Sequence, residues 1–260
     1  MLVIEEKLTE LSSMKKYPDK LYYAGDKELL KKKKISIVGS RKPTKYSKMM
    51  IQNLSSLLAK NGVCVVSGGA MGIDAVAHNG AGSQNTIAVL PCGIDIRYPA
   101  VNKNLLNSIE KNGLLISQFE LGEKSRAYSF VQRNEVVVAL GDLLVVGEAD
   151  LNSGTMRSVE FALAMQKDIY VLPQRIGESV ATNKLVQEGK AKVIYDIEAF
   201  VLEFVGKDKL HVDNESDEFL TFCSNNPSYE EVLAKYPSRV FEAELNGEIS
   251  VQNGRVFQTN

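Results

Sequence analysis

Short apolar runs, each followed by a turn signal and then an amphipathic segment, recur along most of this sequence and constrain its fold more than any other feature. The runs have the length and β-branched content of buried strands, and they lie at 35–38, 63–66, 86–90, 114–117, 142–146, 169–172 and 192–195. Strands that alternate with helices are typical of a parallel sheet with crossover helices on both faces. The sequence therefore predicts an α/β protein with an open, doubly wound, mostly parallel sheet.

Three connecting segments have helical features. Residues 45–60 follow Thr44, a candidate N-cap, and a helix there places one set of apolar side chains on a single face: Met49, Leu54, Leu57 and Leu58. Residues 154–166 do the same with another set: Val159, Ala162, Leu163 and Met165. The segment RNEVVVALG at 133–141 could be a strand because it holds three consecutive valines, but the run at 142–146 leaves little room, so we expect a helix.

The last part of the chain has a different pattern. Residues 207–214 are polar and read as a linker, while 215–260 contain helix-like stretches at 216–224, 229–235 and 238–245. Asn253-Gly254 then lies between alternating residues, which is a strong hairpin signal. We therefore expect a first domain over 1–206, with 1–33 as an N-terminal lead-in, and a small winged-helix-like C-terminal module.

The charge of the chain is unevenly distributed. The net charge is only −1, yet no acidic residue occurs between Leu29 and Ile73, where nine basic side chains lie. This is a local cationic field, or alternatively a solvated lead-in to a buried strand. From Lys207 to Asn260 there are 5 basic and 10 acidic residues. For the C-terminal module we therefore expect a protein partner or a dimer contact rather than DNA.

Other features exclude several classes of protein. No apolar run approaches the roughly 18 residues of a membrane span, and the N-terminal MLVIEEKLTE carries acids where a secretory signal is basic and apolar, so we expect a cytoplasmic protein without a membrane partner. The widely spaced Cys64, Cys92 and Cys223 offer neither a disulfide framework nor a metal knuckle and are expected to be structural. We expect no bound metal.

Glycine-rich loops follow three of the predicted strands, at the edge of the sheet where doubly wound folds bind ligands. Each leads into a helix, whose free N–H groups suit an anion. Their candidate residues are Gly39, Ser40, Arg41 and Lys42, then Ser67, Gly68, Gly69, Ala70 and Gly72, then Ser153, Gly154 and Thr155. Neither the dinucleotide fingerprint nor the P-loop pattern occurs, so we expect no nucleotide cofactor and no catalytic residue. Three such loops indicate an extended groove for a polymeric anion.

Two polar residues near the second loop have simpler interpretations. Asp74 falls in the first turn of a predicted helix and would complement the helix dipole, and His78 would be a packing residue.

A further loop, at 117–136, interleaves basic and aromatic residues as single-strand binders do, with Lys124, Arg126, Phe130, Arg133 and Asn134 as candidates. The alternative is that Tyr128 and Phe130 cap the core.

Five stretches in this order resemble the bacterial DNA-processing protein A family (DprA, or Smf): IVGSR, VVSGGAMGIDAVAH, TIAVLPCGIDIRYP, FVQRNEVVVALGDLLVVGEADLNSGTM and VLPQRIGESVATNKLVQEGKA. The resemblance covers about residues 20–205 and continues weakly into the C-terminal module. It implies an extended Rossmann-like fold, a homodimer and binding of single-stranded DNA. It also implies loading of the RecA recombinase onto incoming strands in natural transformation, with an indirect link to single-stranded-DNA-binding protein.

The resemblance also implies roles for single residues. Arg41 corresponds to the family's DNA-contacting arginine, Ser67 to Gly72 to its glycine loop, Phe130 to its base-contacting aromatic, and Arg133 and Asn134 to its RN pair, while Lys124 and Arg126 share a basic position. A second family arginine is replaced by Glu135.

Two alternative functions stay open. One is a nucleoside-monophosphate-cleaving enzyme of the lysine-decarboxylase-like group, although SGT at 153–155 lacks the preceding PG of that group and Arg157 and Glu160 only loosely match its spacing. The other is a nucleotide-sensing domain.

Overall fold

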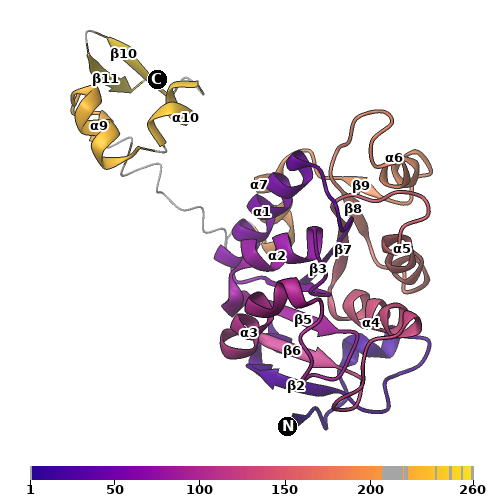
Figure 1. Cartoon of the computed structure of the whole chain (residues 1–260). Helices are drawn as coiled ribbons and strands as arrows, with labels where there is room; N and C mark the ends of the chain where they lie inside the picture. Colours follow the sequence, from indigo (N-terminus) through magenta and orange to yellow (C-terminus); the bar gives the residue numbers. More distant parts are fainter. Residues whose placement is uncertain are drawn as a thin grey trace. The chain divides into compact units, whose positions relative to one another are not determined.

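The structure is a computed structural model of the chain, and it describes residues 2–206, 219, 222–237, 239–245, 248–252 and 254–258. The chain divides into two compact units, residues 1–210 and 211–260, and each is described by itself. Figure 1 shows the helices and strands of both units. The predicted linker at 207–214 lies outside the described residues, so the domain bounds stay a prediction.

A nine-stranded sheet forms the centre of unit 1. Its strands are β1 (Leu2–Val3), β2 (Tyr22–Gly25), β3 (Lys34–Val38), β4 (Cys64–Ser67), β5 (Thr86–Leu90), β6 (Leu114–Ser117), β7 (Leu143–Val146), β8 (Ile169–Val171) and β9 (Lys192–Val193). Their order is β1-β2-β6-β5-β4-β3-β7-β8-β9, and all pairings from β6 to β9 along this order are parallel. Strand β2 pairs antiparallel with both β1 and β6. The doubly wound, mostly parallel sheet is confirmed.

The direction of winding reverses next to β3. From β3 the chain adds β4, β5 and β6 on one side, and it then returns to place β7 against the other side of β3. In open α/β sheets such a switch point leaves a crevice at the carboxyl ends of the two strands, because the following loops diverge to opposite faces. The candidate site is therefore expected beside the ends of β3 and β7.

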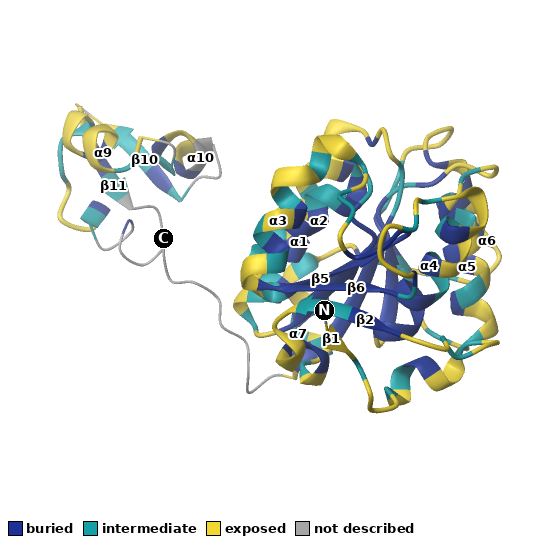
Figure 2. Ribbon diagram, turned by 60° about the horizontal axis from the view of Figure 1, so that its bottom comes forward, coloured by how far each residue is buried: buried dark blue, intermediate teal, exposed yellow. Residues whose placement is uncertain are grey.

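Helices cover both faces of this sheet. One face carries α1 (Lys45–Lys60), α2 (Ile73–Ala81), α3 (Lys103–Asn112) and α7 (Ile197–Val205), and the other carries α4 (Ala127–Leu140), α5 (Thr155–Ala164) and α6 (Val180–Gln187). Short 3-10 helices complete the unit: η1 (Thr9–Ser13), η2 (Lys27–Lys31), η3 (Ser83–Asn85) and η4 (Ala100–Asn102). Figure 2 shows the strands buried between helices whose outer sides are exposed. No helix among the described residues is both long and apolar enough to cross a bilayer.

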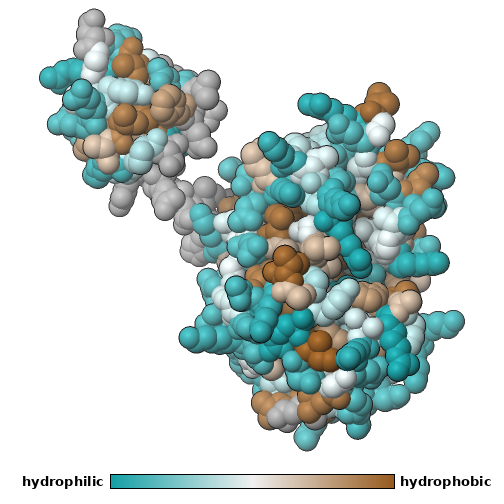
Figure 3. All heavy atoms as spheres, in the orientation of Figure 1, coloured by the Kyte–Doolittle hydropathy of each residue, from teal (hydrophilic) through white to brown (hydrophobic). Residues whose placement is uncertain are grey.

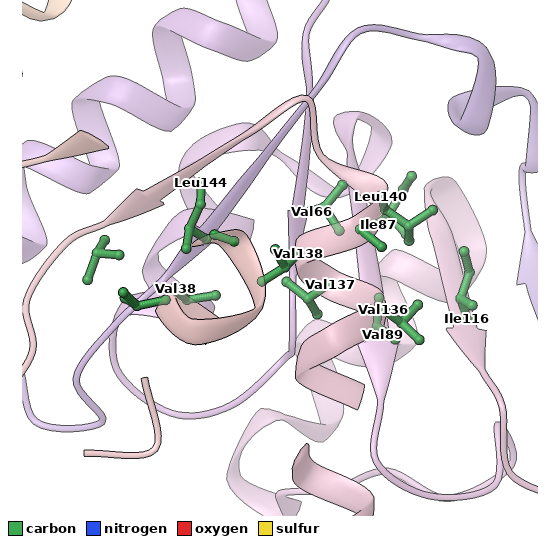
Figure 4. Packing of buried hydrophobic residues seen from close by; sticks show 14 of the residues in the cluster. Val38, Val66, Ile87, Val89, Ile116, Val136, Val137, Val138, Leu140 and Leu144 are labelled. Atoms are coloured by element: carbon green, nitrogen blue, oxygen red, sulfur yellow. The ribbon is translucent and has the colours of Figure 1, made fainter. Parts of the chain in front are cut away.

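Helix α4 confirms the helix expected in the ambiguous valine-rich segment. It begins at Ala127, however, so the loop expected at 117–136 is wrong beyond Arg126, and Phe130, Arg133 and Asn134 lie on a helix. Its residues 136–140 are at most 1% exposed, and Figure 4 shows Val136 and Val137 among side chains of the sheet such as Val66 and Val89. A helix end that is buried on all sides has no polar face, so its sequence lacks the amphipathic repeat. The packing around α4 therefore explains why the segment resembled a strand.

Two predicted core positions are wrong. In α1, Leu54 and Leu58 are buried, but Met49 is 56% exposed because it precedes the buried Ile51 by two positions, which is about 200° around a helix. In α5, the buried face holds Val159 and Ala162, and Leu163 is 40% exposed because it points past that face. Thr44 caps α1 as predicted, since its hydroxyl accepts a hydrogen bond from the Ser47 N–H.

Unit 2 has a small core of its own, made of Phe219, Cys223, Val232, Val240, Ala243, Ile249 and Val256. Its described elements are α9 (Tyr229–Lys235), α10 (Arg239–Leu245) and the antiparallel pair β10 (Ile249–Gln252) and β11 (Arg255–Gln258). The predicted hairpin is therefore present, with Gly254 at a φ of +74°, whereas Asn253 lies outside the described residues. Most of the helix expected at 216–224 also lies outside them.

Candidate nucleic-acid interface

A cleft of about 550 Å³ opens beside the carboxyl ends of β3 and β7, at the switch point of the sheet. The loops after β3, β4 and β7 and the helices α4 and α5 form its walls. Ten residues predicted from the sequence line it: Gly39, Ser40, Arg41, Ala70, Phe130, Arg133, Asn134, Ser153, Gly154 and Thr155. The fold thus brings three loops and two helices from distant parts of the sequence to a single cavity.

Arg41 and Phe130 are in direct contact on the wall of this cleft. The Arg41 Cζ atom lies 5.7 Å from the centroid of the Phe130 ring, within the range of a cation–π interaction. The Phe130 ring packs edge-on against Tyr98, with centroids 5.7 Å apart and planes at 64°. An exposed guanidinium and two aromatic rings therefore lie side by side at this edge of the sheet.

Glycines position the backbone around Arg41. At Gly72, which has a φ of +81°, a Cβ atom would lie 2.2 Å from the Ser40 carbonyl oxygen and 2.7 Å from the Arg41 Cα. The same Ser40 carbonyl accepts a hydrogen bond of 3.0 Å from the Ile73 N–H. Gly72 thus allows the two loops to touch, which is a packing role that the sequence did not indicate.

Asp74 and Arg133 form hydrogen bonds with backbone groups of the glycine loop after β4. The Asp74 carboxylate accepts hydrogen bonds from the Gly68 and Ala70 N–H groups at 3.2 and 3.3 Å, so its role exceeds the predicted helix-dipole contact. Arg133 is 4% exposed and donates to the carbonyls of Gly68 and Val89. Burial raises the pKa of Asp74, and the neighbouring Arg133 and the two N–H groups oppose that rise. Arg133 therefore ties α4 to two strand ends.

The N-terminus of α5 borders the cleft through Ser153, Gly154 and Thr155. Gly154 precedes the helix without a side-chain cap, and a Cβ atom there would meet nothing within 4 Å. The first N–H groups of a helix carry a partial positive charge and favour anions. The open space over Gly154 lets a phosphate approach them.

Seven predicted residues do not line the cleft: Lys42, Ser67, Gly68, Gly69, Gly72, Lys124 and Arg126. Ser67 is buried, and its hydroxyl donates to the Ile37 carbonyl at 2.6 Å. Gly68 and Gly69 are buried as well. Lys42, Lys124 and Arg126 are exposed, so they could contact only a ligand that extends beyond the cleft.

The lysine run at 31–34 lies at the other end of β3 from Arg41. Lys34 is 3% exposed, with its Nζ atom 2.8 Å from the Glu10 carboxylate. Lys31 pairs with Glu28 at 2.7 Å, and Lys33 donates to the Phe204 carbonyl at 3.0 Å. The structure therefore agrees with the alternative of a lead-in to a buried strand, and the cationic stretch is divided between two edges of the sheet.

The remaining titratable candidates are structural. The His78 Nδ1 atom lies 2.6 Å from the Thr86 hydroxyl, and burial lowers the pKa of His78 to about 3, so the ring is neutral and packs as predicted. Cys64, Cys92 and Cys223 are buried free thiols, and burial raises the pKa of Cys64 to about 12. Within the described ranges, no three His, Cys, Asp or Glu side chains cluster closely enough to hold a metal.

Several relevant residues were not among the DNA-contacting candidates of the sequence analysis, although Arg157 and Glu135 were named there for other reasons. Asp150 and Arg157 line the cleft, and Arg157 pairs at 2.8 Å with Glu160. The position of Arg157 two residues after the SGT loop could have indicated it. Tyr98 had no signal, because only its tertiary contact with Phe130 reveals it. Glu135, the departure from the family pattern, accepts a hydrogen bond of 2.9 Å from the Lys15 N–H and so holds the N-terminal segment.

Sequence comparison assigns nearly all of unit 1 to one family. Residues 5–205 match the family described as DNA recombination-mediator protein A. The chain belongs to this family. The resemblance to DprA/Smf proteins is thereby confirmed.

Individual relatives agree with this assignment. The chain is 34% identical over 199 residues to the DNA processing protein DprA of Streptococcus pneumoniae, which is 75% of this chain and 70% of that protein. Other relatives are longer, since the match covers 35% of Protein Smf from Synechocystis. The structure of DNA processing protein A from Helicobacter pylori, described by its single-stranded DNA binding mode, matches with a TM-score of 0.77 and 40% identity over 80% of this chain and 96% of that one. The S. pneumoniae DprA structure gives 0.70 and 31%, over 79% of this chain and 71% of that one.

Proposed function

We propose that this protein is a single-stranded-DNA-binding recombination mediator and not an enzyme. In this proposal it protects incoming strands and loads RecA recombinase onto them during natural transformation, acting as a cytoplasmic homodimer. Family membership supports the role with RecA, and the single-stranded DNA binding mode described for the H. pylori relative supports the ligand.

The contact between Arg41 and Phe130 on the cleft wall is the observation that carries the proposal. A guanidinium can hold a phosphate bidentately or lie along a base, and an aromatic ring accepts any unpaired base by stacking. The N-terminus of α5 contributes partial positive charge at Gly154 on the same cleft. Phosphates and bases of one strand would thus each find a matching group, whereas in a duplex the bases are stacked and paired.

A titration of labelled poly-thymidine and of matched duplex tests the proposal. We expect the wild type to prefer the single strand, with log affinity falling by about 0.7 per phosphate contact as log salt rises. Arg41→Ala should lower both the affinity and this slope. Lys31→Gln is the matched control, because it removes one exposed charge at the opposite end of β3 and should change the affinity less than about twofold.

Four results would contradict the proposal. Equal affinity for duplex and single strand would show that the protein does not prefer single-stranded DNA. Unchanged affinity of Arg41→Ala would show that DNA does not bind at this cleft. Release of free base from nucleoside monophosphates would favour the enzyme alternative, and tight binding of mononucleotides without oligonucleotides would favour a nucleotide sensor.

A further inference from the structure

A second, small recess adjoins the cleft and shares Arg41 and Phe130 with it. Its other walls include Met71 of the glycine loop and Tyr98 of the loop after β5. Its volume is about 20 Å³, so a nucleobase could lie on it but could not enter it. The recess therefore continues the surface of the cleft on the side of Phe130 that faces Tyr98.

The walls of this recess expose apolar and aromatic surface that the core does not use. Met71 is 44% exposed and Tyr98 is 41% exposed. Neither is counted among the residues of the hydrophobic clusters of unit 1. Exposed aromatic and thioether groups beside a cationic side chain suit the flat face of a base, which is apolar, next to its phosphate.

Of the two aromatic rings, Tyr98 is the more available for stacking. The Phe130 ring is partly buried, with Arg41 over it and Tyr98 against it. A base at Phe130 must share the ring with the Arg41 guanidinium. Tyr98 meets Phe130 edge to face, and as a residue it is 41% exposed.

The loop that carries Tyr98 is held in place on both sides. Arg97 donates to the Ile94 carbonyl at 2.6 Å and to the Asn107 side chain at 2.8 Å, and it forms an ion pair with Glu110. Asn102 donates to the carbonyls of the glycine loop at residues 69 and 70, both at 3.0 Å. A ring on a fixed loop loses little freedom when it binds, so this arrangement favours a binding role.

We propose that Tyr98, flanked by Met71, stacks on an unpaired base adjacent to the base at Phe130. The inference rests on the proposed function, because it requires that one strand runs through the cleft and past Arg41. Tyr98 then adds affinity without neutralising a phosphate, and it extends the binding surface from the switch point toward β5.

Tyr98→Ala and Tyr98→Phe test this role, with Tyr195→Ala as control because Tyr195 is 83% exposed and lies beyond β9. Tyr98→Ala should weaken oligo-thymidine binding about 5- to 150-fold, because stacking on one base is lost. The salt slope should stay unchanged, because no phosphate contact is lost. Tyr98→Phe should bind within about twofold of wild type, because the ring is retained. Tyr195→Ala should bind like wild type.

An oligonucleotide with one abasic position separates stacking from loss of fold. An abasic series should contain a position that weakens binding to wild type but has little effect on Tyr98→Ala, because the ring and the base form one interaction. One outcome separates the two proposals: wild type binds oligo-thymidine, Arg41→Ala binds it more weakly, and Tyr98→Ala binds it as well as wild type. That outcome overturns the inference, while the proposed function stands. If each abasic position weakens both proteins equally, the inference is also overturned. If wild type does not bind oligo-thymidine, the proposed function fails first.

Discussion

Gly68 of the glycine loop lies against Arg133 in the middle of α4, and the absence of a side chain at Gly68 sets the position of the guanidinium. A Cβ atom at this position would lie 1.7 Å from the Arg133 Nη1 atom and 2.8 Å from the Asp74 carboxylate. The guanidinium cannot move aside easily, because it is 4% exposed and hydrogen-bonded to two carbonyls. Only glycine fits here.

Gly68→Ala should therefore lower the free energy of unfolding by about 3 kcal/mol, since it displaces a buried charge from its partners. Gly154→Ala is the matched control, because its Cβ meets open space, and its effect should stay below about 1 kcal/mol. Urea denaturation of both variants measures this difference. A Gly68→Ala protein as stable as wild type would show that Arg133 is not held as the structure indicates.

His78 makes the stability of the fold depend on pH. Its pKa is lowered by burial to about 3, below the ordinary value of 6.5, so the unfolded chain binds a proton that the folded chain does not. Stability is therefore full above pH 6.5 and is lost as the pH falls toward 3. From pH 7 to pH 5 this single group should cost about 2 kcal/mol. In urea denaturation His78→Gln should show a smaller loss over this range, and an equal loss would contradict the neutral buried ring.

At the scale of elements, the sequence predicted the parallel strands and the helices between them, because burial in a doubly wound sheet leaves a strong local pattern. Helix α1 was predicted at its observed bounds, Lys45–Lys60. Strands β1 and β2 were not indicated, since their place depends on pairing with β6, which is distant in the sequence. The helical periodicity also wrongly assigned Met49 to the buried face of α1. A few leucines show where the centre of a buried face lies, but they do not show how far the face extends around the helix.

The candidate site was predictable in part for the same reason. Loops after parallel strands must converge at one edge, so the sequence could bring Arg41 and Gly154 together. Phe130 was expected on a loop of the same edge, but it reaches the cleft from helix α4. The sequence could not indicate that Arg133 donates hydrogen bonds to backbone carbonyls or that Tyr98 contacts Phe130. Both contacts join residues that are far apart in the chain.

At the scale of the whole molecule, the surface of unit 1 and the basic side chains of unit 2 can each be described. On the face of unit 1 drawn in Figure 3, hydrophilic residues predominate and hydrophobic ones occur in small groups. In the described part of unit 2, the basic side chains have internal partners: Lys235 lies over the Phe222 ring at 4.5 Å, Arg239 pairs with Glu248 at 2.5 Å, and Arg255 donates to the Asn226 carbonyl at 3.1 Å. Of these three contacts, only that of Arg239 is with an acidic side chain.

We expect residues 207–260 alone to leave single-stranded and duplex DNA unshifted in an electrophoretic assay at moderate salt, since they hold 5 basic and 10 acidic residues. Residues 1–206 should retain most of the affinity of the full chain. Appreciable binding by the short fragment would contradict the expectation that this part of the chain contacts protein.

Photo-crosslinking tests most directly whether a single strand lies in the cleft at the switch point. An oligo-thymidine carrying 5-iodouracil is bound to the full chain and irradiated, and the attached peptides are mapped by mass spectrometry. We expect adducts on peptides that contain Phe130 or Tyr98, and their loss in Arg41→Ala at the same concentrations. Adducts confined to the lysine run at 31–34 or to residues 211–260 would contradict the proposed site.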